Sequence, residues 1–269
     1  MLKANGITET VTQLTQTAMW FLGSMLLIMV GSLQLVWIVV CLFVIASVLL
    51  IVLENVKQSP NVSNGKMEMI KEGWRTLANT PVLRKIAWMD LFETVAGTVW
   101  IAAILYVFVN DALEVDEKWC GFINGSFFLG LILGSIYCIK YSSFIEKKIG
   151  LFILYGSLAS VFVTIMFGLN SFPMVALLLS FLVGLFGQLK NIPQQSVVQT
   201  SVPIEKISTV YTSLGAVATG VFGIGSLLMG LISDLFGVRT VFIISAVLLL
   251  IVSSIVYKNK ELFVTNLDK

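Results

Sequence analysis

The sequence predicts an all-α membrane protein, a polytopic helix bundle with about eight transmembrane helices. Of the 269 residues, 57% are apolar and only 12% are charged, and the mean hydropathy is +0.95. Soluble domains are about 45–50% apolar and about 25% charged. The apolar residues occur in runs that are long enough to cross a bilayer, and most Lys and Arg residues fall in alternate connecting segments. These observations exclude a soluble globular enzyme and a disordered chain.

Eight apolar segments are predicted to span the membrane, because each approaches the roughly 20 residues that a helix needs to cross the hydrocarbon core. A tight turn near Gly31 and Ser32 separates the first two segments. Pro173 lies in the first turn of the sixth, where its missing N–H is tolerated. The predicted spans cover residues 17–33, 34–53, 86–109, 119–139, 150–169, 172–198, 208–233 and 238–257.

The positive charges predict the orientation in the membrane. If the spans alternate in direction, 15 of the 17 Lys and Arg residues lie on one side, and only Lys118 and Arg239 lie on the other. Cytoplasmic segments of membrane proteins carry the excess of Lys and Arg. We therefore expect a multi-pass protein of the cell (plasma) membrane with both termini in the cytoplasm.

The longest polar segment divides the chain into two helices before it and six after it. Within this segment, residues 67–80 are predicted to form an amphipathic helix at the membrane surface. Its apolar face would carry Met67, Ile70, Trp74 and Leu77. The expected organisation is a helical pair at 1–53, a cytoplasmic central loop at 54–85, a six-helix bundle at 86–257 and a cytoplasmic tail at 258–269.

Several classes of chemistry are excluded by the residues that the chain lacks. It contains no histidine and only three cysteines, which are widely spaced. Ser-His-Asp catalysis, Cys-His catalysis and His-ligated zinc are therefore ruled out. No P-loop motif is present, so nothing indicates direct use of ATP. We expect no enzyme activity, no metal, no cofactor and no nucleic-acid partner, and we expect a small-molecule substrate and the lipid bilayer as partners.

Three ionisable residues lie within the predicted spans: Asp90, Glu93 and Lys190. Charged groups inside a membrane are costly and mark functional sites. Asp90 and Glu93 are three residues apart, so they share a helix face. At 1.5 Å per residue, Glu93 and Lys190 would lie roughly 10 and 12 Å from the cytoplasmic edge. We expect one of the acids to face Lys190 across a polar cavity. Alternatively, the acids lie near the headgroups and Lys190 extends to the interface.

Amide side chains surround Lys190, namely Gln188, Asn191, Gln194 and Gln195. Pro193 follows in the same span, so a kink or a break is expected there. Irregular backbone rich in amides, at membrane depth, is typical of a cavity enclosed by protein. The alternative is that the span ends at Lys190 and the amides belong to a loop. Trp100, deep in the third span, is a candidate for lining a pocket for an apolar substrate.

Small residues recur at helical spacing in two spans. Gly130 and Gly134 form a GxxxG pattern in the 119–139 span, and the 208–233 span carries five glycines. Such residues let helix backbones approach closely in lipid, and this packing interpretation is the simpler one. A second interpretation is that they let helices rock against each other during a transport cycle.

Four stretches of the chain carry a resemblance to one family. They are KANGITETVTQLTQ at 3–16, KEGWRTLANTPVLRKI at 71–86, QQSVVQTSVPIEKISTVYTS at 194–213 and GLISDLFGVRTVF at 230–242. In this order they resemble the entry to the fifth helix, the central loop, the loop between helices ten and eleven, and the end of helix eleven in major facilitator superfamily transporters. The resemblance is to the drug-exporter branch that includes macrolide-efflux and siderophore-export proteins. The last stretch resembles that family's G-x-x-x-D-x-x-G-x-R pattern. By this resemblance, the candidate gating or packing residues are Gly230, Asp234, Gly237 and Arg239.

The resemblance implies that the eight spans correspond to helices five to twelve of a twelve-helix fold. The first four helices would then be missing, and the chain would be a fragment or a truncated gene product. The implied function is efflux of amphipathic small molecules or drugs by alternating access, as an antiporter driven by an ion gradient, with protons as the expected ion. Glu93 and Asp90 are the candidates for coupling, and Lys190 is the candidate counter-charge. The alternative is a non-transporting fragment, or a subunit that needs a separate N-terminal four-helix partner.

Overall fold

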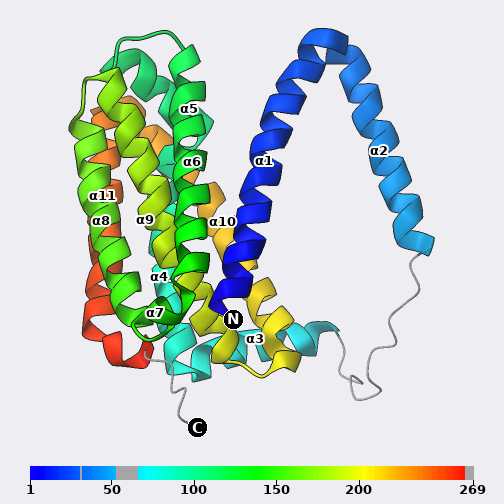
Figure 1. Cartoon of the computed structure of the whole chain (residues 1–269), viewed down its shortest axis with the longest axis vertical. Helices are drawn as coiled ribbons and strands as arrows, with labels where there is room; N and C mark the ends of the chain where they lie inside the picture. Colours follow the sequence, from blue (N-terminus) through cyan, green and yellow to red (C-terminus); the bar gives the residue numbers. More distant parts are fainter. Residues whose placement is uncertain (31, 53–65, 264–269) are drawn as a thin grey trace.

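The computed structural model, which describes residues 1–30, 32–52 and 66–263, is built of helices (Figure 1). Two long helices come first, α1 (Leu2–Val30) and α2 (Ser32–Val52). The first half of α1 packs against the rest of the molecule, and α2 stands apart from the bundle.

The remaining helices form one bundle. Its elements are α3 (Lys66–Asn79), α4 (Pro81–Gly97), η1 (Thr98–Trp100), α5 (Ala102–Val107), η2 (Phe108–Ala112), α6 (Lys118–Lys140), α7 (Ser142–Glu146), α8 (Ile149–Leu169), α9 (Pro173–Thr200), α10 (Ile204–Phe236), α11 (Val238–Lys258) and η3 (Lys260–Phe263). Helix α9 packs against both α6 and α8, and α11 packs against α8, α4 and α10. Helix α9 therefore lies within the bundle, where its polar residues are shielded from lipid.

Five of the described helices are long and apolar enough to cross a membrane: α6, α8, α9, α10 and α11. A sixth span results if the bent pair Pro81–Trp100 and Ala103–Ala112, whose parts meet at 45°, is one crossing. A membrane-embedded helix bundle is thus confirmed. The number eight stays a prediction, because many side chains of the first two helices lie outside the described residues.

Three helices begin before the predicted start of their span, and the span starts themselves stay predictions. Helix α1 begins at Leu2 rather than at 17, so the polar segment before the first apolar run is helical too. Helix α4 begins at Pro81, inside the predicted central loop, because a proline with its fixed φ fits the first turn of a helix. Helix α10 begins at Ile204, directly after Pro203, rather than at 208.

The third predicted span, 86–109, is not one continuous helix. Helix α4 ends at Gly97, and Ile101 has an extended backbone (φ −69°, ψ 151°) between η1 and α5. Trp100 therefore lies at a break. Because α4 starts at Pro81, Glu93 lies about 18 Å into the helix at 1.5 Å per residue, deeper than the sequence predicted.

The predicted surface helix is present as α3. Its buried face is centred on Gly73 and Leu77. A Cβ on Gly73 would collide with Thr209 and Ser213 of α10, so this glycine allows the two helices to touch. Trp74 is 46% exposed rather than packed, and the side chains of Met67 and Ile70 lie outside the described residues.

The GxxxG residues of α6 pack against α9, as the simpler interpretation predicted. A Cβ on Gly130 would collide with the carbonyl oxygen of Phe181, and a Cβ on Gly134 would lie 2.9 Å from the carbonyl oxygen of Leu185. Gly184 of α9 faces the α6 backbone in return. Gly230 differs, because no described atom lies within 4 Å of where its Cβ would be. Helix packing within the described chain therefore does not explain Gly230.

Arg239 connects chain segments at the end of the bundle opposite the start of α1 and the end of α11 (Figure 1). It donates hydrogen bonds to the carbonyl oxygens of Gly168 and Ala112, at 3.3 and 3.2 Å, and to Ser171 Oγ at 2.8 Å. Gly237 joins α10 to α11 with a φ of +83°, a conformation that favours glycine. Asp234 is exposed. Arg239 is thus a packing residue, and gating by these residues stays a prediction.

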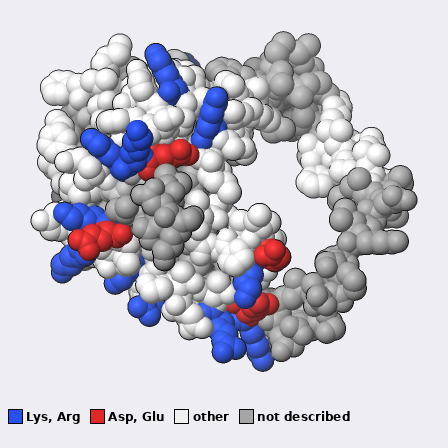
Figure 2. Space-filling model, turned by 60° about the horizontal axis from the view of Figure 1, so that its bottom comes forward, with Lys and Arg blue, Asp and Glu red and all other residues white. Residues whose placement is uncertain are grey.

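Figure 2 shows that Lys and Arg side chains gather on the face at the bottom of the molecule in Figure 1. This face carries the start of α1, helix α3 and the end of α11. The basic face matches the predicted charge distribution, and its placement on the cytoplasmic side stays a prediction.

The glycine contacts give a test of the α6–α9 packing. Gly130→Ala is expected to lower the free energy of unfolding by about 1–3 kcal/mol, because the new methyl group has no room beside Phe181. Gly125→Ala is the matched control on the same helix, since no described atom lies within 4 Å of its Cβ position. Thermal unfolding of the detergent-solubilised protein measures both. Equal midpoints for the two variants would contradict the packing.

Candidate functional site

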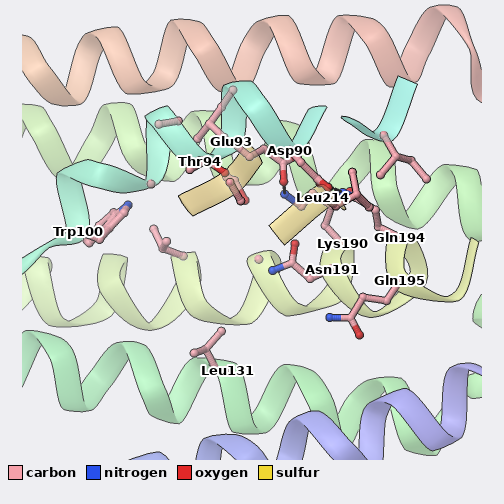
Figure 3. Close-up of a pocket in the computed structure, with 18 of the residues that line it drawn as sticks. Asp90, Glu93, Thr94, Trp100, Leu131, Lys190, Asn191, Gln194, Gln195 and Leu214 are labelled. Atoms are coloured by element: carbon pink, nitrogen blue, oxygen red, sulfur yellow. Dashed lines mark hydrogen bonds and ion pairs between the residues drawn. The ribbon is translucent and has the colours of Figure 1, made fainter. Parts of the chain in front are cut away.

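A cavity of about 520 Å³ opens between α4, α9 and α10, within the range of small-molecule sites (Figure 3). Its polar wall comes mainly from two helices: Asp90, Glu93 and Thr94 on α4, and Lys190, Asn191, Gln194 and Gln195 on α9. Apolar side chains complete it, among them Trp100, Phe127, Leu131 and Leu214.

Helical spacing explains why these residues share one wall. The lining residues include 90, 93, 94 and 97 on α4 and 187, 190, 191, 194 and 195 on α9, and each of these has another lining residue three or four positions away. Side chains at such spacing lie on one face of a helix. Two polar helix faces thus point at each other inside an otherwise apolar bundle.

Lys190 and Glu93 form an ion pair between Nζ and Oε2. Their side chains are only 8% and 16% exposed. The predicted proximity of an α4 acid to Lys190 is therefore present, and the alternative in which Lys190 extends to the membrane interface is wrong. Gly156 of α8 makes room for the lysine, because a Cβ there would lie 2.9 Å from Lys190 Cβ. Removing one partner of such a pair would leave an uncompensated buried charge.

Asp90 is held differently from Glu93. Its Oδ1 accepts a hydrogen bond of 2.7 Å from Gln194 Nε2, and the described residues give it no ion pair. Figure 3 shows Asp90 and Glu93 on the same side of the cavity, with Lys190 and Gln194 facing them from α9. One carboxylate is thus charge-paired and the other is bonded to an amide.

Three buried acceptors at the cavity wall have no hydrogen-bond partner among the described residues. They are Glu93 Oε1, Gln194 Oε1 and Thr164 Oγ1. A buried polar atom without a partner costs about 1–3 kcal/mol, so native structures satisfy such atoms with water or a ligand. These atoms lie behind the cavity surface, so the wall contains buried polar groups that the described residues leave unsatisfied.

Helix α9 continues through Pro193 to Thr200 without a break, although the proline nitrogen cannot donate to the carbonyl of Leu189. The alternative in which the span ends at Lys190 is therefore wrong. Asn191, Gln194 and Gln195 are helical residues that line the cavity.

Gln188 does not line the cavity, in contrast to the prediction. It is buried against α6 and α1, where its Nε2 donates to Ser135 Oγ at 3.0 Å and to Glu9 Oε2 at 3.2 Å. Gln195 lines the cavity and donates to Glu9 Oε1 at 3.1 Å. Sequence reasoning missed Glu9 because it assigned no structure to residues 1–16. The four-residue spacing of Asn5 and Glu9, typical of one helix face, was the available signal.

Trp100 closes the apolar end of the cavity, as predicted for a pocket-lining residue. Its ring lies 4.7 Å from that of Phe167 and 5.7 Å from that of Phe242, centroid to centroid. Phe127 stacks on it at 6.2 Å. Such aromatic contacts fix the indole, so the cavity has a rigid apolar end and a charged middle.

The chain is similar in sequence to several known proteins. The chain is 33% identical over 247 residues to the uncharacterised MFS-type transporter YjbB of Bacillus subtilis, covering 92% of this chain and 61% of that protein. It is 32% identical over 261 residues to the uncharacterised MFS-type transporter YfmI of the same organism, covering 93% and 62%. It is 30% identical over 174 residues to the multidrug resistance protein MdtG of Proteus mirabilis, covering 62% and 42%.

The matched region thus spans less than two thirds of the length of each of these relatives. No solved structure matches the chain. YjbB and YfmI are both named MFS-type transporters. The profile of the Major Facilitator Superfamily matches residues 94–262, more than half of the chain, and the protein is a member of that superfamily.

Proposed function

We propose that this chain exports amphipathic small molecules or drugs across the plasma membrane by alternating access, as an antiporter coupled to protons. The observation that carries the proposal is the buried Lys190–Glu93 ion pair, next to Asp90, in the wall of a ligand-sized cavity. The relative MdtG is named a multidrug resistance protein, which supports the drug class.

The chemistry of the cavity supports coupling through the two carboxylates. A proton on Glu93 would leave Lys190 as an unpaired buried charge, which is unfavourable. With Glu93 ionised, the Lys190 ammonium is paired inside the protein. With Glu93 protonated, Lys190 needs another anion or water around it, so protonation favours a different conformation of the site. Asp90 has no lysine partner among the described residues, so a cationic group of the substrate can take that place. A proton and a cationic substrate would then exclude each other at Asp90.

The apolar end of the cavity suits the other half of an amphipathic molecule. Trp100 and Phe127 offer flat aromatic surface, and the acids lie further along α4. Aromatic faces attract cations and aromatic rings. The proposed substrate is therefore an apolar or aromatic body that carries a cationic or hydrogen-bond-donating group.

The proposed orientation places the basic face of Figure 2 and both chain termini in the cytoplasm, following the excess of Lys and Arg. The proposed organisation assigns 1–53 to the last two helices of an N-terminal bundle and 86–257 to the C-terminal six-helix bundle. Helix α2 stands apart from the C-terminal helices, which supports this division for α2, whereas α1 packs against α6 and α9 (Figure 1).

The transport proposal is tested by ethidium accumulation in a host without its own efflux pumps. Cells that express the protein are expected to accumulate less ethidium than cells with an empty vector, and a proton uncoupler is expected to remove the difference. Asp90→Asn keeps a group that can bond Gln194 but removes the charge, so it is expected to abolish the uncoupler-sensitive part. The exposed Glu117→Gln is the matched control and is expected to retain it. Normal efflux by Asp90→Asn would refute its coupling role.

The ion pair is tested by charge exchange. Glu93→Lys and Lys190→Glu each place two like charges together, so each is expected to lower the free energy of unfolding by about 3–5 kcal/mol. The double variant restores opposite charges and is expected to recover most of this loss in thermal unfolding. If the double variant is no more stable than the single variants, the pairing is not what holds this site together.

A second candidate function is a subunit or fragment that transports only together with a separately encoded N-terminal four-helix segment. The observation that favours it is that the match spans 61% and 62% of the YjbB and YfmI lengths. The ethidium assay separates the two candidates. Efflux by the 269-residue chain alone supports the first. Efflux only after the upstream reading frame is joined or co-expressed supports the second.

A further inference from the structure

Glu9 is a partly buried acid on α1 that the proposed transport function does not use. Its two carboxylate oxygens accept hydrogen bonds from two amides of α9: Oε1 from Gln195 Nε2 at 3.1 Å and Oε2 from Gln188 Nε2 at 3.2 Å. Gln188 Nε2 also donates to Ser135 Oγ of α6 at 3.0 Å. The carboxylate thus joins α1 to α9 directly and to α6 through Gln188.

Further contacts hold the same part of α1 against α9. Asn5 and Gln199 exchange two side-chain hydrogen bonds of 3.0 Å each, and Asn5 Nδ2 also donates to Ser196 Oγ at 3.0 Å. A Cβ on Gly6 would lie 2.7 Å from Ile139 Cγ1, so the α1 backbone lies close against α6. The attachment of α1 to the bundle is therefore polar on the α9 side and closely packed on the α6 side.

The carboxylate of Glu9 fixes which end of each amide faces α1. An ionised carboxylate only accepts hydrogen bonds, so both glutamines must present their nitrogens to it. Because Gln195 also lines the cavity, its side-chain Oε1 is left for a cavity ligand, and no described residue donates a hydrogen bond to it. A neutral glutamine at position 9 could accept from only one of the two nitrogens, so the other glutamine would have to turn its amide and present its oxygen to keep a bond.

We propose that Glu9 is a positioning residue of the transport site, which joins α1 to the segment of α9 that lines the cavity. The proposal rests on the proposed transport function, because the cavity is the site that Glu9 serves. Glu9 holds the Gln195 amide in one orientation at the cavity wall and ties α1 to α9 through the same bonds. The same hydrogen bonds attach α1 to the bundle and orient the cavity-lining residues of α9. A change that loosens α1 therefore also loosens this part of α9, and the reverse holds as well.

Hydrogen exchange of the full chain in lipid nanodiscs, without ligand, tests the proposal. Glu9→Gln is expected to speed exchange about tenfold in peptides from α1 residues 2–16 and from α9 residues 188–200, because both bonds lose their charged acceptor and one partner amide must turn. Glu72→Gln is the matched control, since Glu72 bonds Lys206 at 2.8 Å on the distant α3–α10 contact. It is expected to leave both segments unchanged.

A swap of donor and acceptor separates positioning from a general loss of stability. In Glu9→Gln combined with Gln195→Glu, the amide at position 9 can accept from Gln188 and donate to the new carboxylate. Exchange in both segments is expected to return to within about twofold of the native rate.

Faster exchange in both segments together with recovery in the swap supports the proposal. Unchanged exchange in Glu9→Gln, faster exchange in α1 alone, or no recovery in the swap overturns it. The outcome does not depend on transport: if no form of the chain exports ethidium, the proposed function fails, and the exchange rates still decide the role of Glu9.

Discussion

The buried ion pair between Lys190 and Glu93 is the interaction on which the rest of the site depends. Neither charge is tolerable alone within a membrane bundle, so α4 and α9 are held at the separation at which Nζ reaches Oε2. This separation leaves room for the cavity between the two polar faces and α10. The pair also cancels the charge that would otherwise attract ions regardless of substrate, which leaves Asp90 as the acid without a lysine partner in the described chain.

Small residues make this arrangement possible because they allow α9 to lie between two helices. Gly134 of α6 lies against Leu185 and Gln188, and Gly156 of α8 lies against the stem of Lys190. Larger residues at these positions would push α9 away and rotate its polar face. The close packing therefore determines where the amides point: Gln195 toward the cavity, Gln188 toward α6 and α1. The contacts that pack α9 against α6 and α8 therefore also determine which of its polar side chains reach the cavity.

Much of the fold could be predicted from the composition of the chain and the spacing of its apolar residues. The site could be predicted only in part. Long apolar runs predicted the spans, and the charges inside them predicted that an acid of α4 meets Lys190. The break at Ile101 was not predictable, because no proline or paired glycine marks it. Glu9 was missed because hydropathy ignores polar helices such as the first half of α1. Gln188 was misplaced because polar density alone does not say which helix face meets a cavity and which meets a neighbouring helix.

The most direct test of the account is the reactivity of cysteines at the centre of α9 toward a water-soluble maleimide, with Cys41, Cys120 and Cys138 replaced by serine. Asn191 lines the cavity next to the ion pair, and Ile192 is fully buried on another face of the same helix. Asn191→Cys is expected to react in intact membranes, whereas Ile192→Cys is expected to react only after denaturation. Equal reactivity at the two positions would contradict a water-accessible cavity around Lys190 and Glu93.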